Sequence, residues 1–464
     1  MTLEAAARAA HAEVLHGADV MLRGAASDNR QVKAGDLFAA IAGERVDGHD
    51  FAEGAVPAGA AAGLATRDPV RGRPAAPVLL VDDTVKALGR IAHAWREGFA
   101  GRVAGITGTA GKTTTKELLA HMLSQHGKTA KNRLNLNSQI GMPIAMMSAD
   151  GDEAFWVMEA GISHPDDMDE LGPILEPDLA VILNVGAGHA LGLGGKGTAY
   201  YKSRLLAHIK KGGEALVSAD YEDLVREARA IRPDAVFFSV QGRPVPYRAS
   251  YLGLDENGRG NYRLWLDGEE LEVSCALSGA YAAENILAAA AAARLYGLSC
   301  EEIRRGVESA LFPAQRFARH EIAGWTVIDD TYNANPLSAC RMIEAAAELA
   351  GGRDFICVMG AMGELGDIAA VEHRRLGSTL AASGCRAVFW TGEHADDVRQ
   401  GLEEAHFSGL FAVIAAPEDF LPALERWEKN RRDDRKALVL FKGSRVNRME
   451  RLVNLFMERK NHAL

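Results

Sequence analysis

Short apolar runs alternate with longer segments of helical periodicity along most of the chain, and the apolar runs end in polar or glycine-rich turns. This alternation is typical of β-α-β units, in which helices join parallel strands. The pattern therefore predicts an α/β fold. The strands expected in the middle and last parts of the chain are 103–107, 155–159, 179–185, 214–218, 326–330, 355–359, 387–390, 411–415 and 437–441.

The chain is expected to form three units, because its 464 residues exceed what one hydrophobic core organises. The first unit, 1–99, precedes the main run of strands and is a smaller α/β unit. The central unit, 100–313, alternates strands and helices as parallel sheets do. The third unit, 314–464, repeats this alternation and is expected to form a Rossmann-like sheet.

The strongest chemical signal is the stretch GITGTAGKTTTKE, residues 105–117, which contains a glycine turn directly after a predicted strand. Glycines let backbone N–H groups surround a phosphate, Lys112 adds a cation, and the Thr113 hydroxyl can bind a magnesium ion. The spacing is a shorter variant of the usual P-loop and predicts nucleoside triphosphate binding. The predicted phosphate loop comprises Gly108, Thr109, Ala110, Gly111, Lys112, Thr113 and Thr114.

Two further strands of the central unit lead to residues that can hold a metal ion near those phosphates. Glu159 ends one strand, and His189 lies in the glycine-rich loop beyond the next. Because the carboxyl ends of parallel strands meet at one sheet edge, both side chains are expected to reach the space beside Thr113. A lone glutamate or histidine is more often a surface or capping residue, but the shared edge favours ligands. By pattern alone, Lys202 is a helix-surface lysine.

Three polar loops follow strands of the third unit, at 329–336, 358–366 and 441–450, and are expected to face a common cleft. No GxGxxG stretch is present in this unit, so a dinucleotide is not implied. Polar residues of the first unit cluster at turns, and their pattern alone favours turn chemistry and solvated surface.

Composition narrows the class of protein. The net charge of −10 argues against a general nucleic-acid or anionic-membrane surface. The amino-terminal stretch has no apolar signal-peptide core, and no apolar run is long enough to span a bilayer. The cysteines lie far apart and are expected to be reduced, which indicates a cytoplasmic enzyme; they are Cys275, Cys300, Cys340, Cys357 and Cys385.

Taken together, the motifs resemble the Mur ligase family of peptidoglycan synthesis over nearly the whole chain. GTAGKTT (108–114) is similar to that family's phosphate loop, and NLNSQIGMP (135–143) to its second central motif. The members that add D-alanyl-D-alanine are the most similar in three stretches, which are DNRQVKAGDLFAAIAGERVDGHDF (28–51), YNANP (332–336) and KGSRVNRME (442–450).

The resemblance assigns roles to single residues. It implies a catalytic set of Lys112, Glu159, His189 and Lys202, and two magnesium ions on Thr113, Glu159, His189 and a carbamylated Lys202. For ATP it implies further contacts from Asn285, Arg316, Asp330 and Asn333, with Asp330 on the ribose. For a UDP-sugar it implies contacts in the first unit from Asp28, Asn29, Arg30, Gly43, Glu44, Asp47, Gly48 and His49.

The implied enzyme has an N-terminal UDP-substrate α/β domain, a central P-loop ATPase domain with a parallel sheet and a C-terminal Rossmann-like ligase domain. It adds D-alanyl-D-alanine to UDP-N-acetylmuramoyl-tripeptide through an acyl phosphate, using ATP and magnesium, in the last cytoplasmic step of pentapeptide precursor synthesis. We expect a monomer that binds no nucleic acid and inserts into no membrane. The third peptide residue, diaminopimelate or lysine, is not readable from the pattern.

Some positions depart from the family pattern. Ala110 replaces a common asparagine, Asn29 replaces a serine, and Tyr281 and Ala282 replace a customary His-Asn pair before Asn285. The adenine side of the site is therefore the part that the pattern specifies least.

Other classes share parts of the pattern. A P-loop kinase or ATPase would share 108–114 without requiring Lys202, and a non-catalytic nucleotide-binding regulator would not need Glu159 and His189. Folylpolyglutamate synthase and cyanophycin synthetase share the ATP machinery, but the first unit fits neither well.

Overall fold

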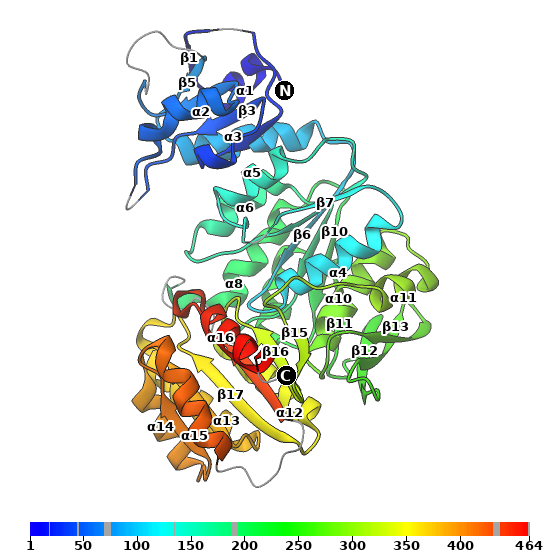
Figure 1. The fold of residues 1–464 in the computed structure, drawn as a ribbon. Coiled ribbons are helices and arrows are strands. Elements are labelled where there is room, and N and C mark those ends of the chain that lie inside the picture. Colours follow the sequence, from blue (N-terminus) through cyan, green and yellow to red (C-terminus); the bar gives the residue numbers. More distant parts are fainter. Residues whose placement is uncertain are drawn as a thin grey trace.

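The computed structural model describes residues 1–17, 19–43, 46–68, 76–133, 135–186, 194–429 and 437–462. Three sheets follow one another along the chain, one in each predicted unit. Figure 1 shows the first unit at one end of the molecule, the central unit in the middle and the third unit at the other end. The predicted three-part α/β architecture is confirmed, whereas the boundaries at 99 and 313 stay a prediction.

The first unit holds a sheet of order β1-β5-β4-β3-β2, in which β1 is antiparallel and the other strands are parallel. Its strands are β1 (Glu13–Leu15), β2 (Gly24–Ala26), β3 (Asp36–Ala39), β4 (Ala62–Ala65) and β5 (Val78–Leu80). Its helices are α1 (Leu3–Ala10), η1 (Asn29–Gln31), η2 (Gly48–Phe51), α2 (Ala52–Ala58) and α3 (Thr84–Glu97).

The central sheet has the order β14-β13-β12-β11-β10-β9-β6-β8-β7, parallel from β7 to β12 and antiparallel beyond β12. Its strands are β6 (Arg102–Thr107), β7 (Thr129–Lys131), β8 (Phe155–Glu159), β9 (Leu179–Ile182), β10 (Glu214–Ser218), β11 (Val236–Ser239), β12 (Tyr247–Leu254), β13 (Gly260–Leu266) and β14 (Glu269–Cys275). Its helices are α4 (Lys112–Ser124), α5 (Gly141–Met147), α6 (Asp167–Leu175), η3 (Gly194–Lys196), α8 (Gly197–Ser203), η4 (Arg204–His208), α9 (Glu222–Ile231), α10 (Ala282–Leu295) and α11 (Cys300–Glu308).

The third sheet has the order β15-β16-β20-β17-β18-β19, and only its edge strand β15 is antiparallel. Its strands are β15 (Ala318–Ile322), β16 (Trp325–Asp330), β17 (Asp354–Gly360), β18 (Ala387–Thr391), β19 (Leu410–Val413) and β20 (Ala437–Lys442). Its helices are α12 (Pro336–Ala350), η5 (Gly366–Ile368), α13 (Ala369–Ala382), α14 (Ala395–Glu404), η6 (Pro417–Asp419), α15 (Phe420–Lys429), η7 (Arg445–Asn447) and α16 (Glu450–Asn461).

Successive side chains of the central strands point to opposite faces of the sheet and enter two different cores. On β8, Trp156 and Met158 pack with residues of the first unit, including Leu88 of α3. Phe155 and Val157 lie on the other face, in a cluster that also contains α4, α10 and part of the third unit. The central sheet therefore separates two cores, each of which it shares with a neighbouring unit.

Among the described residues, no helix is both long enough and apolar enough to cross a membrane.

Candidate active site

A cleft of about 770 Å³ lies between the central and third units. Loops at the carboxyl ends of β6, β8, β16, β17 and β20 line it, so the three polar loops of the third unit do face a common cleft. The predicted residues in its walls are Thr109, Ala110, Gly111, Lys112, Thr113, Thr114, Glu159, Asn285, Arg316, Asp330 and Asn333.

The phosphate loop turns sharply at Gly111, whose φ of +80° is a conformation that favours glycine. A Cβ added there would lie 2.0 Å from Oδ1 of Asn285, so the Asn285 side chain packs directly on the turn. The Lys112 ammonium lies across the loop and donates to the Gly108 carbonyl at 2.9 Å. Helix α4 begins at Lys112, and the N–H groups of its first turn form an anion site at the cleft wall.

Asn184, just after β9, holds the other part of the loop. The Ala110 N–H donates to Asn184 Oδ1 at 2.8 Å, and the Thr109 N–H donates to the Asn184 carbonyl at 3.0 Å. These two N–H groups are therefore engaged within the protein. The first turn of α4 and Lys112 are the other groups of the loop that can meet a phosphate.

Glu159 lies next to the loop and is held from several sides. The Thr113 hydroxyl donates to Glu159 Oε2 at 2.5 Å, and Asn137 Nδ2 donates to Oε1 at 2.7 Å. Burial raises the pKa of Glu159, but the positive charges of Lys112 and Lys116 outweigh it and the net shift is downward. Glu159 is therefore a buried carboxylate anion.

Lys202, on α8, is fully buried, and its Nζ has no hydrogen-bond partner among the described residues. Burial, and then the charge of Lys112, lowers the pKa of the Lys202 amine well below its usual value, while Glu159 opposes this shift. The Lys202 amine is therefore close enough to Lys112 and Glu159 to interact with both, although it does not line the cleft. A helix-surface position, which the pattern alone favoured, is wrong.

Asp330 and Arg316 stand on the third-unit side. The Asp330 carboxylate accepts from Lys442 Nζ at 2.5 Å and from the Phe317 N–H at 3.0 Å. The Arg316 guanidinium stacks on the Tyr332 ring, 4.0 Å from its centroid. Tyr281 and Phe317 also line the cleft, with ring centroids 6.2 Å apart. These rings form an aromatic wall beside Asp330, on the side of the site that the pattern specifies least.

The predicted substrate residues of the first unit lie at the carboxyl edge of its sheet. Arg30 pairs with Asp28 at 2.6 Å and lowers the pKa of that carboxyl to about 2. The Asp47 carboxylate bonds to His49 Nδ1, and His49 Nε2 accepts from the Thr66 N–H at 3.1 Å. Both ring nitrogens of the buried His49 are thus engaged in shaping the loop.

Three other predicted residues also lie at this edge. Asn29 is the first residue of η1, and Gly43 lies between β3 and η2. Gly48 packs so tightly that an added Cβ would lie 2.6 Å from the Ile41 nitrogen. His189 and Glu44 lie outside the described residues, so the predicted metal set and substrate set each include one residue without a described position.

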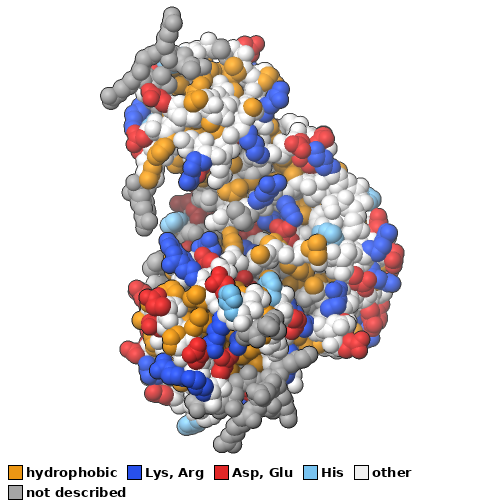
Figure 2. All heavy atoms as spheres, viewed as in Figure 1, with side chains coloured by type: hydrophobic (Ala, Val, Ile, Leu, Met, Phe, Trp, Pro, Cys, Tyr) orange, Lys and Arg blue, Asp and Glu red, His pale blue; other side chains and the backbone are white. Residues whose placement is uncertain are grey.

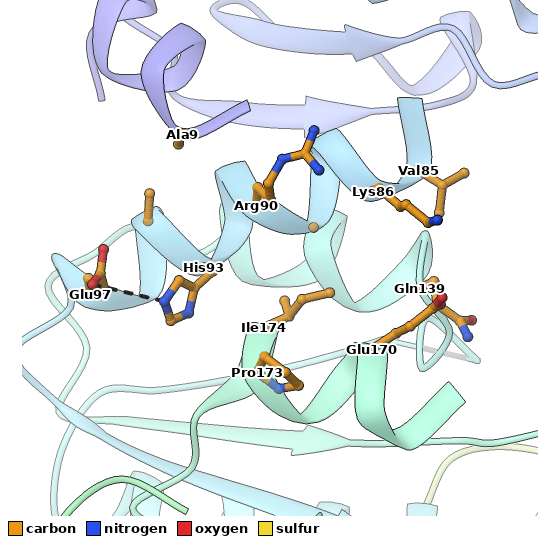
Figure 3. A pocket seen from close by; sticks show the side chains of 12 residues that line it. Ala9, Val85, Lys86, Arg90, His93, Glu97, Gln139, Glu170, Pro173 and Ile174 are labelled. Atoms are coloured by element: carbon orange, nitrogen blue, oxygen red, sulfur yellow. Dashed lines mark ion pairs between the residues drawn. The ribbon is translucent and has the colours of Figure 1, made fainter. Parts of the chain in front are cut away.

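A second hollow, of about 480 Å³, lies between the first and central units. Figure 3 shows Val85, Lys86 and Arg90 on α3 across from Pro173 and Ile174 on α6. Its lining is largely apolar and, within the described part of the chain, includes none of the predicted substrate residues. The hollow is therefore distinct from the sheet edge that carries Asp28 and Arg30.

Sequence reasoning missed several residues that hold the site. Asn137 belongs to the second central motif but was given no role there. Asn184 falls within the predicted strand 179–185, and nothing in the pattern indicates its bonds to the phosphate loop. Lys116 is buried and donates to the Asn132 carbonyl at 2.6 Å. Glu284 and Arg341 carry no motif signal, because each is one charged residue in an alanine-rich helix with no recognisable spacing to a partner.

Comparison with known proteins supports the same architecture. The family description "Mur ligase family, catalytic domain" matches residues 23–96, "Mur ligase middle domain" matches 106–293, and "Mur ligase, glutamate ligase domain" matches 315–445.

A UDP-N-acetylmuramoyl-tripeptide–D-alanyl-D-alanine ligase of Synechocystis sp. is 34% identical over 86% of each chain. The crystal structure of MurF from Acinetobacter baumannii superposes with a TM-score of 0.87 at 30% identity over 98% of each chain. The ADP complex of MurF ligase from Thermotoga maritima gives a TM-score of 0.80 at 27% identity, over 95% of this chain and 99% of that one. With these matches across all three sheets, the chain belongs to the Mur ligase family.

Proposed function

We propose that this protein is an ATP-dependent ligase that joins D-alanyl-D-alanine to UDP-N-acetylmuramoyl-tripeptide. The observation that carries the proposal is the grouping of Lys112, Thr113, Glu159 and Lys202 beside a cleft that the third unit covers. The curated relative with that ligase name, which aligns over 86% of the chain, supports the choice of substrates.

ATP is proposed to lie along the cleft, with its phosphates at the first turn of α4. The Thermotoga maritima neighbour was solved with ADP, which supports this use of the fold. The ribose is assigned to Asp330, whose carboxylate retains lone pairs beyond its bonds to Lys442 and Phe317. The adenine is assigned to the wall formed by Tyr281 and Phe317.

Magnesium fits the donors at the phosphate loop. A threonine hydroxyl and an ionised carboxylate are oxygen ligands of the kind that this ion prefers, and they already lie 2.5 Å apart at Thr113 and Glu159. When bound, the ion supplies positive charge against the phosphate oxygens. His189 is proposed as a further ligand on family resemblance alone.

Lys202 is proposed to carry a carbamyl group. An amine adds carbon dioxide only in its neutral form, and the lowered pKa of the buried Lys202 favours that form. The carbamyl group would place a carboxylate on Lys202 Nζ, which has no hydrogen-bond partner among the described residues, and this anion can bind a second magnesium ion.

The chemistry brings two anions together, so the site must offset charge and align the reactants. The terminal carboxylate of the tripeptide attacks the γ-phosphorus and ADP departs, which leaves an acyl phosphate. The amine of D-alanyl-D-alanine then attacks the acyl carbon, loses a proton and expels phosphate. Lys112 offsets the phosphate charge, and the third unit shields the acyl phosphate from water.

The first unit is proposed to bind the uridine diphosphate part of the substrate. Arg30 is exposed and can turn from Asp28 to a diphosphate. Figure 2 shows Lys and Arg side chains on the side of the first unit that faces the rest of the molecule and on the surface opposite it, which suits an anionic substrate.

The test is phosphate release by the purified protein with ATP, magnesium and UDP-N-acetylmuramoyl-tripeptide, with and without D-alanyl-D-alanine. We expect release that depends on the dipeptide, together with a pentapeptide product identified by mass. Release that ignores the dipeptide, or that requires a free amino acid instead, would overturn the substrate assignment and keep the ATP site.

A further inference from the structure

The carboxylate of Glu284 is buried at the junction of the central and third units. Its side chain on α10 is 1% exposed and accepts three hydrogen bonds. Asn184 Nδ2 and Arg341 Nη1 donate to Oε2 at 2.7 and 2.8 Å, and the Tyr221 hydroxyl donates to Oε1 at 3.1 Å. Arg341 belongs to α12, so one of these donors comes from the third unit.

Glu284 determines which way the Asn184 amide faces. Asn184 Oδ1 accepts from the Ala110 N–H, while Nδ2 donates both to the Ala110 carbonyl at 3.0 Å and to Glu284. If the amide were reversed, its NH₂ would face the Ala110 N–H and its oxygen would face a carboxylate. The buried charge of Glu284 excludes that arrangement and fixes the phosphate loop through Asn184.

Helix α12 docks on the central unit along one face. Arg341, Ala345 and Glu348 are spaced as one helical stripe. Ala345 lies so close to Gly279 that a Cβ on that glycine would be 2.7 Å away, and Glu348 accepts from the Tyr251 hydroxyl at 2.7 Å. Arg341 is thus the cation that this docked face presents to Glu284.

Removing α12 would leave Glu284 buried with neutral donors only. A buried carboxylate that loses its cation is strongly destabilised, and the groups around it rearrange. Asn184 is the neighbour that would lose its orientation, and the loop at Ala110 depends on Asn184. Docking of the third unit and the shape of the phosphate loop are therefore linked by a continuous path of hydrogen bonds.

We infer that Glu284 and Arg341 are a positioning pair, through which docking of the third unit sets the nucleotide affinity of the phosphate loop. This inference rests on the proposed use of ATP by this cleft and adds the residues that couple the two units. Neither residue is required to touch the nucleotide.

The first test compares two full-length variants by ADP binding, measured by calorimetry. Arg341→Met removes the cation, and we expect the affinity for ADP to fall by about tenfold or more. Tyr251→Phe is the matched control, since it removes another bond between α12 and the central unit at two residues that do not line the cleft. We expect its ADP affinity to stay within about twofold of the native value. Equal losses in both variants, or no loss in Arg341→Met, would overturn the inference.

A second test separates positioning from direct contact, because Arg341 also lines the cleft. In the double variant Glu284→Gln/Arg341→Met, the glutamine oxygen still accepts from Asn184 and no charge is left buried. We expect most of the ADP affinity lost in Arg341→Met to return. If the double variant binds ADP as weakly as Arg341→Met, Arg341 acts on the nucleotide directly and the pairing role is wrong.

The affinity for the UDP-sugar substrate gives a further readout. A general loss of structure would weaken both ligands, whereas a positioning pair affects ADP alone. These results are independent of the ligase assignment: native protein that binds ADP but shows no dipeptide-dependent phosphate release would refute the proposed reaction and still allow the pair to be tested.

Discussion

Two of the sheet edges with predicted ligands, one in the first unit and one in the central unit, differ in how far their charged side chains are exposed to water. At the first edge, the Arg30 side chain is 83% exposed and pairs with Asp28 in contact with water. At the central edge, Glu159 is 4% exposed and Lys202 is fully buried. An exposed ion pair is weak and screened by salt, so it can exchange its partner for a ligand at little cost.

Buried charges behave differently, because each must be offset by fixed neighbours. Glu159 is bonded by Thr113 and Asn137 before any ligand arrives. Such preorganised charge acts most strongly on a transition state. The comparison indicates that the first edge is built for reversible recognition and the central edge for chemistry, and the predictions below test this division.

The largest effect is expected at Glu159. Glu159→Gln keeps the shape and the bond to Thr113 but removes the charge, and kcat should fall about 10²- to 10³-fold. The KM for the UDP-sugar substrate should change little, as measured by steady-state phosphate release. A kcat within twofold of the native value would refute the chemical role of this edge.

Lys202→Ala should lower kcat about 100-fold if a carbamyl group there holds charge in the transition state. Native protein kept free of carbon dioxide should lose activity in the same direction and regain it with bicarbonate, whereas the variant should not respond. Full activity of Lys202→Ala at low bicarbonate would exclude the carbamyl role.

At the first edge, Arg30→Ala should raise the KM for the UDP-sugar about tenfold and leave kcat unchanged, because the side chain binds without taking part in the reaction. The difference from native protein should shrink as ionic strength rises, since the site is open to water. A fall in kcat with unchanged KM would mean that Arg30 takes part in the reaction, and it would refute the division between a recognition edge and a catalytic edge.

Gly48→Ala should act on stability. The added Cβ would lie 2.6 and 2.7 Å from the backbone nitrogen and oxygen of Ile41, atoms that cannot rotate away. A loss of about 1–3 kcal/mol is expected from such overpacking, seen as a lower denaturation midpoint. Gly98→Ala is the control, because the atoms nearest to its Cβ lie at ordinary contact distances.

The smallest expected effect is on how folding stability depends on pH. The pKa of Lys202 is lowered well below its usual value in the folded protein. Between that lowered pKa and the ordinary value near 10.5, the unfolded chain holds a proton that the folded protein lacks, so stability rises with pH. Lys202→Met should flatten this rise in denaturant titrations at successive pH values in carbon dioxide-free buffer. If stability rises with pH as steeply in the variant as in the native protein, the pKa of Lys202 is not lowered in the folded state.

The sequence predicted elements whose apolar runs are continuous. Strands β8 (Phe155–Glu159) and β10 (Glu214–Ser218) match their predicted ranges. Short or polar edge strands were missed. β1 has three residues, and β15 reads ARHEI, so neither shows the apolar run on which the prediction depends.

The contacts within the site also divide into those that the sequence pattern predicts and those that it does not. The contact of Thr113 with Glu159 could be predicted, because both follow strands of one parallel sheet. The contacts of Glu284 with Asn184 and Arg341 could not, because they join residues 100 and 57 positions apart that share no motif. Periodicity places a residue on an element, but only the packed fold shows which distant side chains meet.

The two cores that share the central sheet bear on how the molecule unfolds. A fragment limited to residues 100–313 would lose the first-unit side chains from one core, including Leu88, and the third-unit side chains from the other, although α4 and α10 would still cover Phe155 and Val157. The units are therefore poor candidates for separate expression. Heating is expected to melt the outer units cooperatively with the sheet between them, so a calorimetric scan should show fewer endotherms than there are sheets.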